Sequence, residues 1–312
     1  MLNRRRFLAA STAVAGVAAG LDAFAAKPAA RLILLGTKGG PRPGPNRLGS
    51  SQALVVGSEI FVVDCGDGVA SQLRRAGLQL RNVRHVFLTH MHSDHVADYG
   101  NLLYFAWYSG LKKKLHAWGP PEITSLTKAA LDYHAHDVAI RVEDEGRRAL
   151  APLVAAHPMK SAGDVVRHGA VRVRAALVDH PPLVPSFAYR FDTPAGSVVI
   201  SGDTAPSDAL VALARDADIL VHEVVYKPRL DAFLDRLPSA NAKFRRHLLR
   251  SHTTTKQVGK IAKRAGVKKL VLSHLVPGGD DVLTDEVWRR DVARDYDGEI
   301  VVGRDLMSIP LR

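Results

Sequence analysis

The stretch Thr89-His90-Met91-His92-Ser93-Asp94-His95 places three imidazoles and one carboxylate within six consecutive residues. It follows the apolar run Val83-Arg84-His85-Val86-Phe87-Leu88, which is typical of a buried strand. A single histidine is more often an ordinary core or surface residue than a ligand. A cluster of ligand-type side chains has no use in packing, whereas zinc binds imidazole and carboxylate groups readily. The stretch therefore predicts a metal site at the end of a strand.

Three further apolar runs also end in a ligand-type side chain: His180, Asp203 and His274. In α/β folds the carboxyl ends of the strands face a common crevice, so these side chains are expected to converge with the histidine cluster. The converged set would contain His90, His92, Asp94, His95, His180, Asp203 and His274. Seven ligands exceed the three or four of a single zinc, but they suit two metals that share a carboxylate and a hydroxide.

The pattern of the rest of the chain predicts hairpins followed by alternating strands and helices. Strands are expected at 31–36, 53–56, 60–63, 83–88, 115–118, 171–178, 188–191, 197–200, 219–223 and 270–274, with two short closing strands. Helices are expected at 69–76, after an N-cap at Asp94, at 121–133, 206–215, twice within 229–250, and at 254–265 and 284–294. Residues 134–168 are expected to hold mixed short elements. This pattern predicts an α/β protein with two sheets covered by helices in one domain.

Composition sets wide limits. The 312 residues are 46% hydrophobic and 24% charged, which suits a globular protein with one large or two small cores. The 43 Lys+Arg against 31 Asp+Glu give a formal charge of +12. This charge indicates either anionic partners or simple solubility. Cys65 is the only cysteine, so an intramolecular disulfide is excluded, and a buried, unreactive thiol is expected.

The N-terminus resembles an export signal. Twin arginines within Asn3–Leu8 precede an Ala-rich run at 9–20 and the A-x-A-like site Ala23-Phe24-Ala25. We therefore expect a Tat signal over residues 1–25, a catalytic domain over 26–312, and a periplasmic or secreted protein. The apolar run is shorter than a bilayer span, so no stable membrane anchor is expected.

The His-x-His-x-Asp-His stretch, the later lone histidine, a Gly-Asp-Thr and the final strand-end histidine resemble the metallo-β-lactamase superfamily. The similarity is greatest to its ribonuclease Z-like and type III arylsulfatase-like branches. Further matching segments are Leu35-Gly36-Thr37, Asp64-Cys65-Gly66-Asp67-Gly68, Ala188-Tyr189-Arg190, Ser201-Gly202-Asp203-Thr204, Val221-His222-Glu223 and Ser251-His252-Thr253-Thr254. This resemblance implies a four-layered αββα sandwich in a single domain.

The resemblance also implies roles for the site residues. It implies two Zn²⁺, with Mn²⁺ or Fe²⁺ as alternatives. One ion would be held by His90, His92 and His180, the other by Asp94, His95 and His274, and Asp203 would bridge them. Asp94 would also orient the nucleophilic water. His252 would stabilise developing charge or protonate the leaving oxygen, the alternative being a helix-capping role, and His222 would support the site from behind.

The function expected from these features is exported hydrolysis of a small anionic ester, either an aryl sulfate or a phosphodiester. Lys38, Arg42 and Arg47 either attract this anion or simply belong to a solvated loop. The alternatives are a ribonuclease Z-like phosphodiesterase or tRNA 3′-endonuclease, a lactonase or β-lactamase-like enzyme, and a zinc protein without catalysis. Only eleven residues, 191–201, separate Arg190 from Gly202, so the long tRNA-gripping insertion of ribonuclease Z is missing. We therefore expect no nucleic-acid partner. The expected partners are a small substrate and, as an alternative to the monomer, a second copy of the chain.

Overall fold

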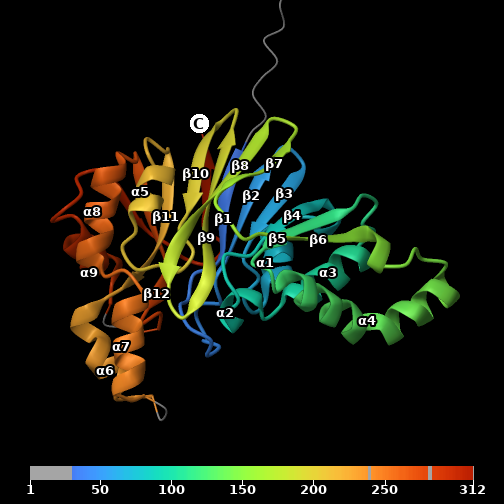
Figure 1. Ribbon diagram of the computed structural model, residues 1–312, viewed down its shortest axis with the longest axis horizontal. Helices are drawn as coiled ribbons and strands as arrows, with labels where there is room; N and C mark the ends of the chain where they lie inside the picture. The colour runs from blue at the N-terminus through green and yellow to red at the C-terminus, as the bar shows by residue number, and fades with distance from the viewer. Residues whose placement is uncertain (1–29, 238–239, 280–282, 312) are drawn as a thin grey trace, which may run out of the picture.

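The computed structural model describes residues 30–237, 240–279 and 283–311, whose centre is a pair of sheets packed face to face (Figure 1). The first sheet has seven strands. Their order is β14 (Ser308–Leu311), β1 (Ala30–Gly36), β2 (Ser51–Val56), β3 (Glu59–Val63), β4 (Val83–Phe87), β5 (Leu115–Gly119) and β6 (Val154–Pro158). The pairs from β14 to β3 are antiparallel, and those from β3 to β6 are parallel.

The second sheet also has seven strands and mirrors this plan. Their order is β13 (Glu299–Val302), β12 (Lys269–Val276), β11 (Ile219–Val225), β10 (Gly196–Ile200), β9 (Leu183–Thr193), β8 (Val171–His180) and β7 (Gly163–His168). The pairs from β13 to β10 are parallel, and those from β10 to β7 are antiparallel. The parallel strands of each sheet therefore end at one edge.

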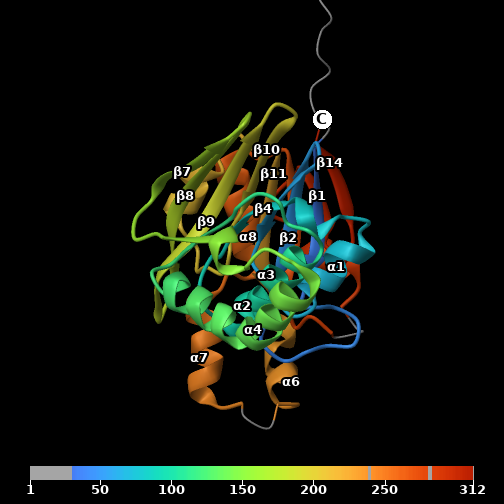
Figure 2. The ribbon, with the colours of Figure 1, turned by 90° about the vertical axis from the view of Figure 1, so that its right-hand side faces the viewer.

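Helices cover the outer face of each sheet (Figures 1 and 2). On the first sheet lie α1 (Val69–Arg75), α2 (Ser93–Val96), α3 (Tyr99–Tyr108) and α4 (Ile123–Glu145). On the second lie α5 (Asp208–Leu213), α8 (Thr255–Ala265) and α9 (Asp285–Val292). The pair α6 (Leu230–Leu234) and α7 (Ala242–Ser251) extends beyond the sheets, and 3₁₀ turns lie at Leu80–Asn82, Ala151–Leu153 and Lys227–Arg229. The four-layered αββα sandwich predicted from the sequence is confirmed.

Strand β1 shows why the sandwich needs apolar residues on both strand faces. Leu32 and Leu34 point into the core between the two sheets, whereas Ile33 and Leu35 point into the core beneath the helices. Successive side chains alternate across a strand, so a strand that is covered on both faces reads as a continuous apolar run. Cys65 lies in the helix-side core with no exposed surface, as predicted, and burial raises the pKa of its thiol.

Two local predictions differ from the structure. The helix expected to end near Tyr133 continues to Glu145. The strands β6 and β7 lie in the remaining part of 134–168, where mixed short elements were expected. Asp94 is not an N-cap. It lies inside the single turn of α2, and the next helix begins separately at Tyr99. The side chain of Asp94 accepts a hydrogen bond from the backbone of Gly40, which draws it away from its own helix end.

The predicted export signal, residues 1–25, lies outside the described residues. In the part of the chain that the structure describes, no helix combines the length and the hydropathy needed to cross a bilayer.

Candidate metal centre

Four strand ends bring the predicted ligands together at the edge of the sandwich that carries α2 (Figure 1). His90 and His92 follow β4, His180 ends β8, and Asp203 follows β10. His90 Nε2 lies 3.1 Å from His92 Nδ1, and His180 Nε2 lies 3.0 Å from the same His92 atom. These three histidines and Asp203 form one group whose ligand atoms could hold a metal ion.

A second group adjoins the first and consists of Asp94, His95 and His274. His274 lies in β12 and has a positive φ of 44°, which turns its ring toward the crevice. Its Nε2 lies 3.3 Å from Asp94 Oδ2 and 3.1 Å from Asp203 Oδ2. The opposite oxygen of Asp203, Oδ1, lies 3.4 Å from His95 Nε2. Asp203 therefore faces both groups, which is the position expected of a shared ligand.

The donor atoms are arranged to bind a metal ion rather than to form hydrogen bonds with one another. His95 Nε2 and Asp203 Oδ1 are buried, and neither has a hydrogen-bond partner among the described residues. Buried polar atoms without partners are costly unless a water or an ion satisfies them. Imidazole nitrogens that face one another at about 3 Å are arranged as they would be around a shared cation. The donor set of nitrogens and carboxylate oxygens suits Zn²⁺ and its first-row neighbours.

Asp64 supports the second group from behind. It follows β3, and its Oδ2 lies 2.8 Å from His95 Nδ1, while its Oδ1 accepts a hydrogen bond of 2.8 Å from the backbone N–H of Thr89. A carboxylate on the far nitrogen fixes the tautomer and the orientation of a metal-binding histidine. The carbonyl oxygen of Ser251 does the same for His180 at a distance of 2.8 Å.

Glu223 holds His252 beside the metal groups. His252 Nδ1 lies 3.0 Å from Glu223 Oε1, which also accepts hydrogen bonds from the backbone N–H groups of Thr204 and Thr253. Burial alone would lower the pKa of His252, but the charges of Glu223 and Asp203 outweigh burial and raise this pKa to about 9. The protonated ring is therefore favoured. Because Nδ1 contacts Glu223, Nε2 is the ring nitrogen that remains for contact with a substrate.

Sequence reasoning missed these two supporting carboxylates. The expected supporter, His222, is buried and its Nδ1 contacts the carbonyl of Glu223, 2.7 Å away, whereas its Nε2 has no partner in the described residues. Its neighbour Glu223 does the supporting instead. Asp64 stands at the end of a strand next to β4, so the rule that singled out His180, Asp203 and His274 would also have found it.

Members of both groups line a cavity of about 520 Å³: His92 and Asp203 from the first, Asp94 and His274 from the second, with His252 beside them. One wall is the glycine- and proline-rich loop 38–45. It approaches the centre closely, since a Cβ on Gly39 would lie 2.7 Å from His274 Nδ1. Another part of the lining comes from the segment that holds α6 and α7; it includes Arg236, His247 and a group of apolar side chains. The apolar side chains are Phe233, Leu237, Phe244 and Leu248.

The three cations of the loop, Lys38, Arg42 and Arg47, differ in what they contact. Lys38 and Arg42 line the cavity, and Lys38 Nζ donates to the carbonyls of Gly39 and Gly40. Arg47 instead donates to Thr37 and to the carbonyl of Gly303, which ties the loop to the C-terminal end of the chain.

Comparisons with known proteins fit this geometry. A family model described as "Anti-Pycsar protein Apyc1" matches residues 31–276. Ribonuclease Z from Mycobacterium bovis is 34% identical over 281 residues, which cover 89% of this chain and 97% of that protein. Ribonucleases of this kind are metal-dependent hydrolases that act on phosphodiester bonds.

Solved structures share the architecture. The metallo-β-lactamase-fold protein YhfI from Bacillus subtilis has a TM-score of 0.66 and 20% identity, covering 91% of this chain and 100% of that one. The short form of human tRNase Z has a TM-score of 0.65 and 20% identity, covering 90% and 99%. At this identity the two structures establish the fold alone.

These matches correct two predictions. The periplasmic or secreted location is wrong, because the relatives matched along nearly their whole length are ribonuclease Z enzymes, which process RNA. The missing insertion also does not distinguish this chain from its ribonuclease Z relative. An alignment of 281 residues that spans 97% of the Mycobacterium bovis enzyme leaves no room for a long extra arm there either. The arylsulfatase-like resemblance gains no support from these relatives.

Proposed function

We propose that this chain, which belongs to the ribonuclease Z-like, metallo-β-lactamase-fold hydrolases matched by the Apyc1 family model, is a phosphodiesterase with two metal ions. The observation that carries the proposal is the position of Asp203 between two ligand groups that reach one cavity. Asp203 belongs to the group of His90, His92 and His180, and its carboxylate lies 3.1 Å from His274 and 3.4 Å from His95 of the other group. His90, His92 and His180 would hold one zinc, and Asp94, His95 and His274 the other. Two such cations would acidify a shared water and polarise a phosphoryl oxygen.

The chain's own residues complete the reaction. Asp94 Oδ2 is held 2.8 Å from the N–H of Gly40, so this carboxylate is positioned to orient the attacking water. Burial would raise the pKa of Asp94, but His95 and His274 outweigh burial and keep it ionised. His252, fixed through Nδ1 by Glu223, presents Nε2 to donate a proton to the departing oxygen.

The cavity walls indicate the kind of phosphodiester. Lys38 and Arg42 attract the anionic group, and the apolar side chains of Phe233, Leu237 and Phe244 also line the cavity. This combination suits a phosphate joined to a flat, apolar group such as a nucleobase. A precursor tRNA 3′ end is the second candidate, supported by the relatives named ribonuclease Z.

A substrate panel tests the proposal. The zinc-loaded protein is assayed with bis(p-nitrophenyl) phosphate, thymidine 5′-p-nitrophenyl phosphate, a precursor tRNA, p-nitrophenyl sulfate, a lactone and a β-lactam. We expect turnover of the phosphodiesters, and Asp203→Ala should lower kcat/KM by about three orders of magnitude or more, because metal stabilisation of the transition state is worth several kcal/mol. Turnover of the sulfate alone, or full activity of Asp203→Ala, would overturn the proposal.

A further inference from the structure

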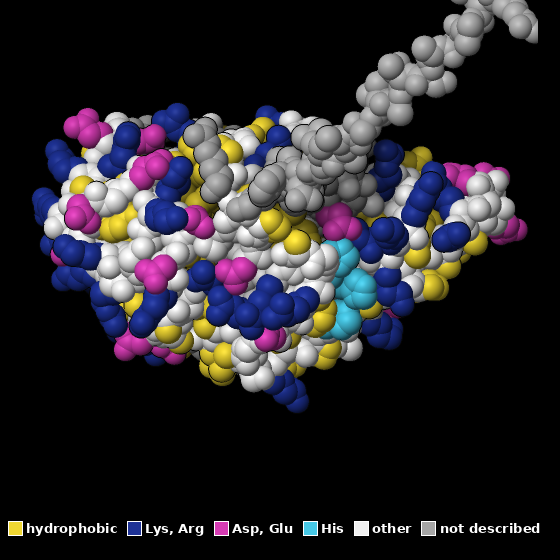
Figure 3. All heavy atoms as spheres, turned by 90° about the horizontal axis from the view of Figure 1, so that it is seen from above, with side chains coloured by type: hydrophobic (Ala, Val, Ile, Leu, Met, Phe, Trp, Pro, Cys, Tyr) yellow, Lys and Arg dark blue, Asp and Glu magenta, His cyan; other side chains and the backbone are white. Residues whose placement is uncertain are grey.

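A second concentration of charge lies at the opposite ends of β4 and β5 from the metal centre. Arg81 and Arg84 stand at the start of β4, and Lys112 and Lys113 precede β5, whereas the metal ligands follow the other end of β4. Figure 3 shows the molecule from above, with Lys and Arg side chains on both sides of a band of histidines. We call the cationic surface built from Arg81, Arg84, Lys112, Lys113, Arg147 and Arg148 the basic edge.

The basic edge contains two adjoining hollows. One, of about 260 Å³, is lined by Arg81, Arg84, Lys112 and Lys113. The other, of about 520 Å³, is lined by Lys112, Arg147, Arg148 and the indole of Trp107. Gly110 and Lys112 belong to both hollows, so the two form one continuous track.

Most of these cations are uncompensated. Within the described residues, Arg81, Lys112, Lys113 and Arg148 are exposed and form no ion pair. Arg147 is paired with Glu145. Glu59 is the carboxylate in the smaller hollow. It lies 3.9 Å from Arg84 Nε and is already engaged at 2.7 Å by His168. An anion entering this track would therefore meet more positive than negative charge.

Arg84 is a partly shielded cation at the smaller hollow. The residue is only 9% exposed, and its Nε has no hydrogen-bond acceptor in the described part of the chain. A guanidinium that is shielded from water is costly unless an acceptor reaches it. Burial also lowers the pKa of Arg84. Arg84 also lines the smaller hollow, so its guanidinium adds to the positive charge that an anion would meet there.

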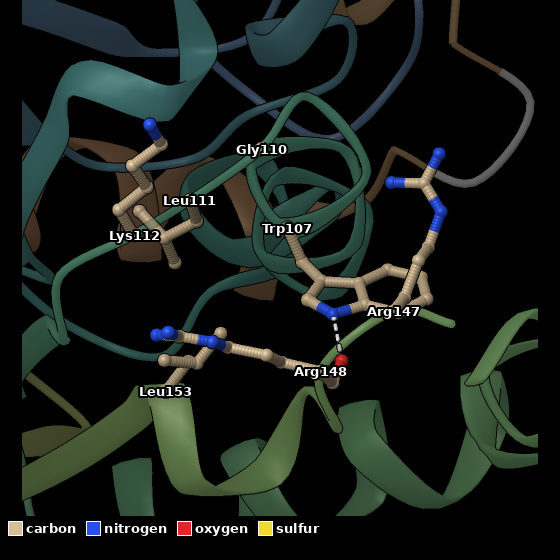
Figure 4. A pocket seen from close by; sticks show the side chains of 7 residues that line it. All are labelled: Trp107, Gly110, Leu111, Lys112, Arg147, Arg148 and Leu153. Atoms are coloured by element: carbon tan, nitrogen blue, oxygen red, sulfur yellow. Dashed lines mark hydrogen bonds between the residues drawn. The ribbon is translucent and has the colours of Figure 1, made fainter. Parts of the chain in front are cut away.

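A hydrogen bond from Trp107 fixes the shape of the larger hollow. Trp107 Nε1 donates a 2.7 Å hydrogen bond to the backbone carbonyl of Arg148, which fixes the floor, as Figure 4 shows. Lys112 and Arg148 reach out on the same side of that indole (Figure 4). Beside it, the guanidinium of Arg147 lies 4.2 Å from the ring centre of Tyr108, and this ring is 42% exposed. The guanidinium of Arg141 also lies over this ring, 4.8 Å from its centre, so Tyr108 holds Arg147 in place beside the hollow. A guanidinium held in this way is well suited to bind phosphate.

We propose that the basic edge binds the phosphate backbone of a single-stranded RNA segment, at a site separate from the metal centre. The inference goes beyond the proposed phosphodiesterase activity and does not depend on it. It is opposed to the expectation, drawn from the sequence, that the chain has no nucleic-acid partner. That expectation rested on the missing tRNA-gripping insertion, but backbone binding needs only a cationic track and no such arm.

Fluorescence anisotropy tests the proposal. The full chain, stripped of metal by a chelator so that it cannot cleave the probe, is titrated into a labelled single-stranded RNA of about 12 nucleotides. The test variant is Lys112→Glu/Lys113→Glu/Arg148→Glu. The matched control is Lys256→Glu/Lys260→Glu/Lys263→Glu, which makes the same change in net charge on exposed positions of α8. Both are also assayed for hydrolysis of bis(p-nitrophenyl) phosphate.

We expect the test variant to lose at least about tenfold in affinity, and the slope of log Kobs against log salt to fall by about two, since each lost phosphate contact on a single strand removes about 0.7 from the slope. The control should keep most of the affinity, and both variants should keep the hydrolytic activity. Equal losses in both variants would mean bulk attraction and would overturn the site. So would unchanged binding in the test variant, or binding to phosphatidylserine vesicles without binding to RNA. If the unmodified chain does not hydrolyse bis(p-nitrophenyl) phosphate, this result counts against the phosphodiesterase proposal and leaves the RNA-binding proposal unaffected.

Discussion

The carboxylate of Asp64 lies 2.8 Å from Nδ1 of His95, and both groups are buried. This contact fixes the ring whose other nitrogen faces Asp203. Because such supporting carboxylates orient metal-binding histidines, Asp64→Ala should weaken zinc binding at the Asp94/His95/His274 group by about 10- to 100-fold. Competition with a chromogenic chelator measures this. Asp132→Ala, on the exposed face of α4, is the control and should bind zinc as the unmodified chain does. Equal affinity for Asp64→Ala would show that Asp64 has no part in metal binding.

His252 should matter most for poor leaving groups. Its Nδ1 is held by Glu223, so Nε2 is the atom left to donate a proton. We expect His252→Ala to lower kcat by about 10²- to 10⁴-fold for a phosphodiester with an alkoxide leaving group, because that oxygen needs protonation. The loss should be much smaller for a p-nitrophenyl ester, whose leaving group departs without a proton. Zinc content should stay the same. A uniform loss with both substrates would show that His252 serves the structure of the site instead.

The apolar side chains from the segment of α6 and α7 should contribute to binding and not to chemistry. Phe244 faces the cavity from α7 and lies away from the ligand groups. Since stacking on an aromatic ring is worth about 1–3 kcal/mol per base, Phe244→Ala should raise KM for thymidine 5′-p-nitrophenyl phosphate by about tenfold. KM for methyl p-nitrophenyl phosphate and both kcat values should change little. Phe105→Ala, an exposed ring on α3, is the control. Equal rises in KM for the two substrates would exclude a contact with the base.

Acid should destabilise the fold through His85. This ring is 3% exposed, stacks on Phe61 and accepts a hydrogen bond from Trp118 Nε1. Burial, helped by the positive charges that face the ring, lowers its pKa to about 3. These groups are His168, His116, Arg84 and His157. The folded state therefore favours the neutral ring, so the stabilisation is complete above the unfolded pKa of about 6.5 and is lost as the pH falls toward 3.

Between pH 7 and pH 5 this one group should cost about 2 kcal/mol of unfolding free energy. Urea unfolding of His85→Gln should therefore show a decline over this range that is smaller by about that amount than in the unmodified chain. His136→Gln, at an exposed position of α4, should decline as the unmodified chain does. Identical pH slopes for His85→Gln and the unmodified chain would rule out His85 as the source.

Strand ends explain why the ligands could be found from the sequence. His90, Asp203 and His274 belong to or follow parallel strands, whose carboxyl ends meet at one edge of a sheet. His180 reaches the same edge because β8 lies two antiparallel steps from β10 and so runs in the same direction. The roles of the supporting carboxylates were missed because they depend on tertiary contacts. Asp64 also follows an apolar run, so the strand-end rule places it near the crevice, but only the pairing of β3 with β4 shows that its carboxylate reaches His95. The length of α4 was also missed, because that helix buries only Ile123 and Thr127 and so lacks an apolar stripe to mark its course.

The sequence by itself determined the fold class and predicted the side chains that gather at the candidate metal centre, because alternating apolar runs and clustered ligand-type residues are local properties of the chain. Tertiary structure alone decided which groups surround those ligands and which cations assemble far from them. Glu223 reaches His252 across 29 positions of the chain, and Lys112 and Arg148 line one hollow although 36 positions separate them. Contacts of this kind depend on how strands and helices pack, and no local pattern of residues carries that information.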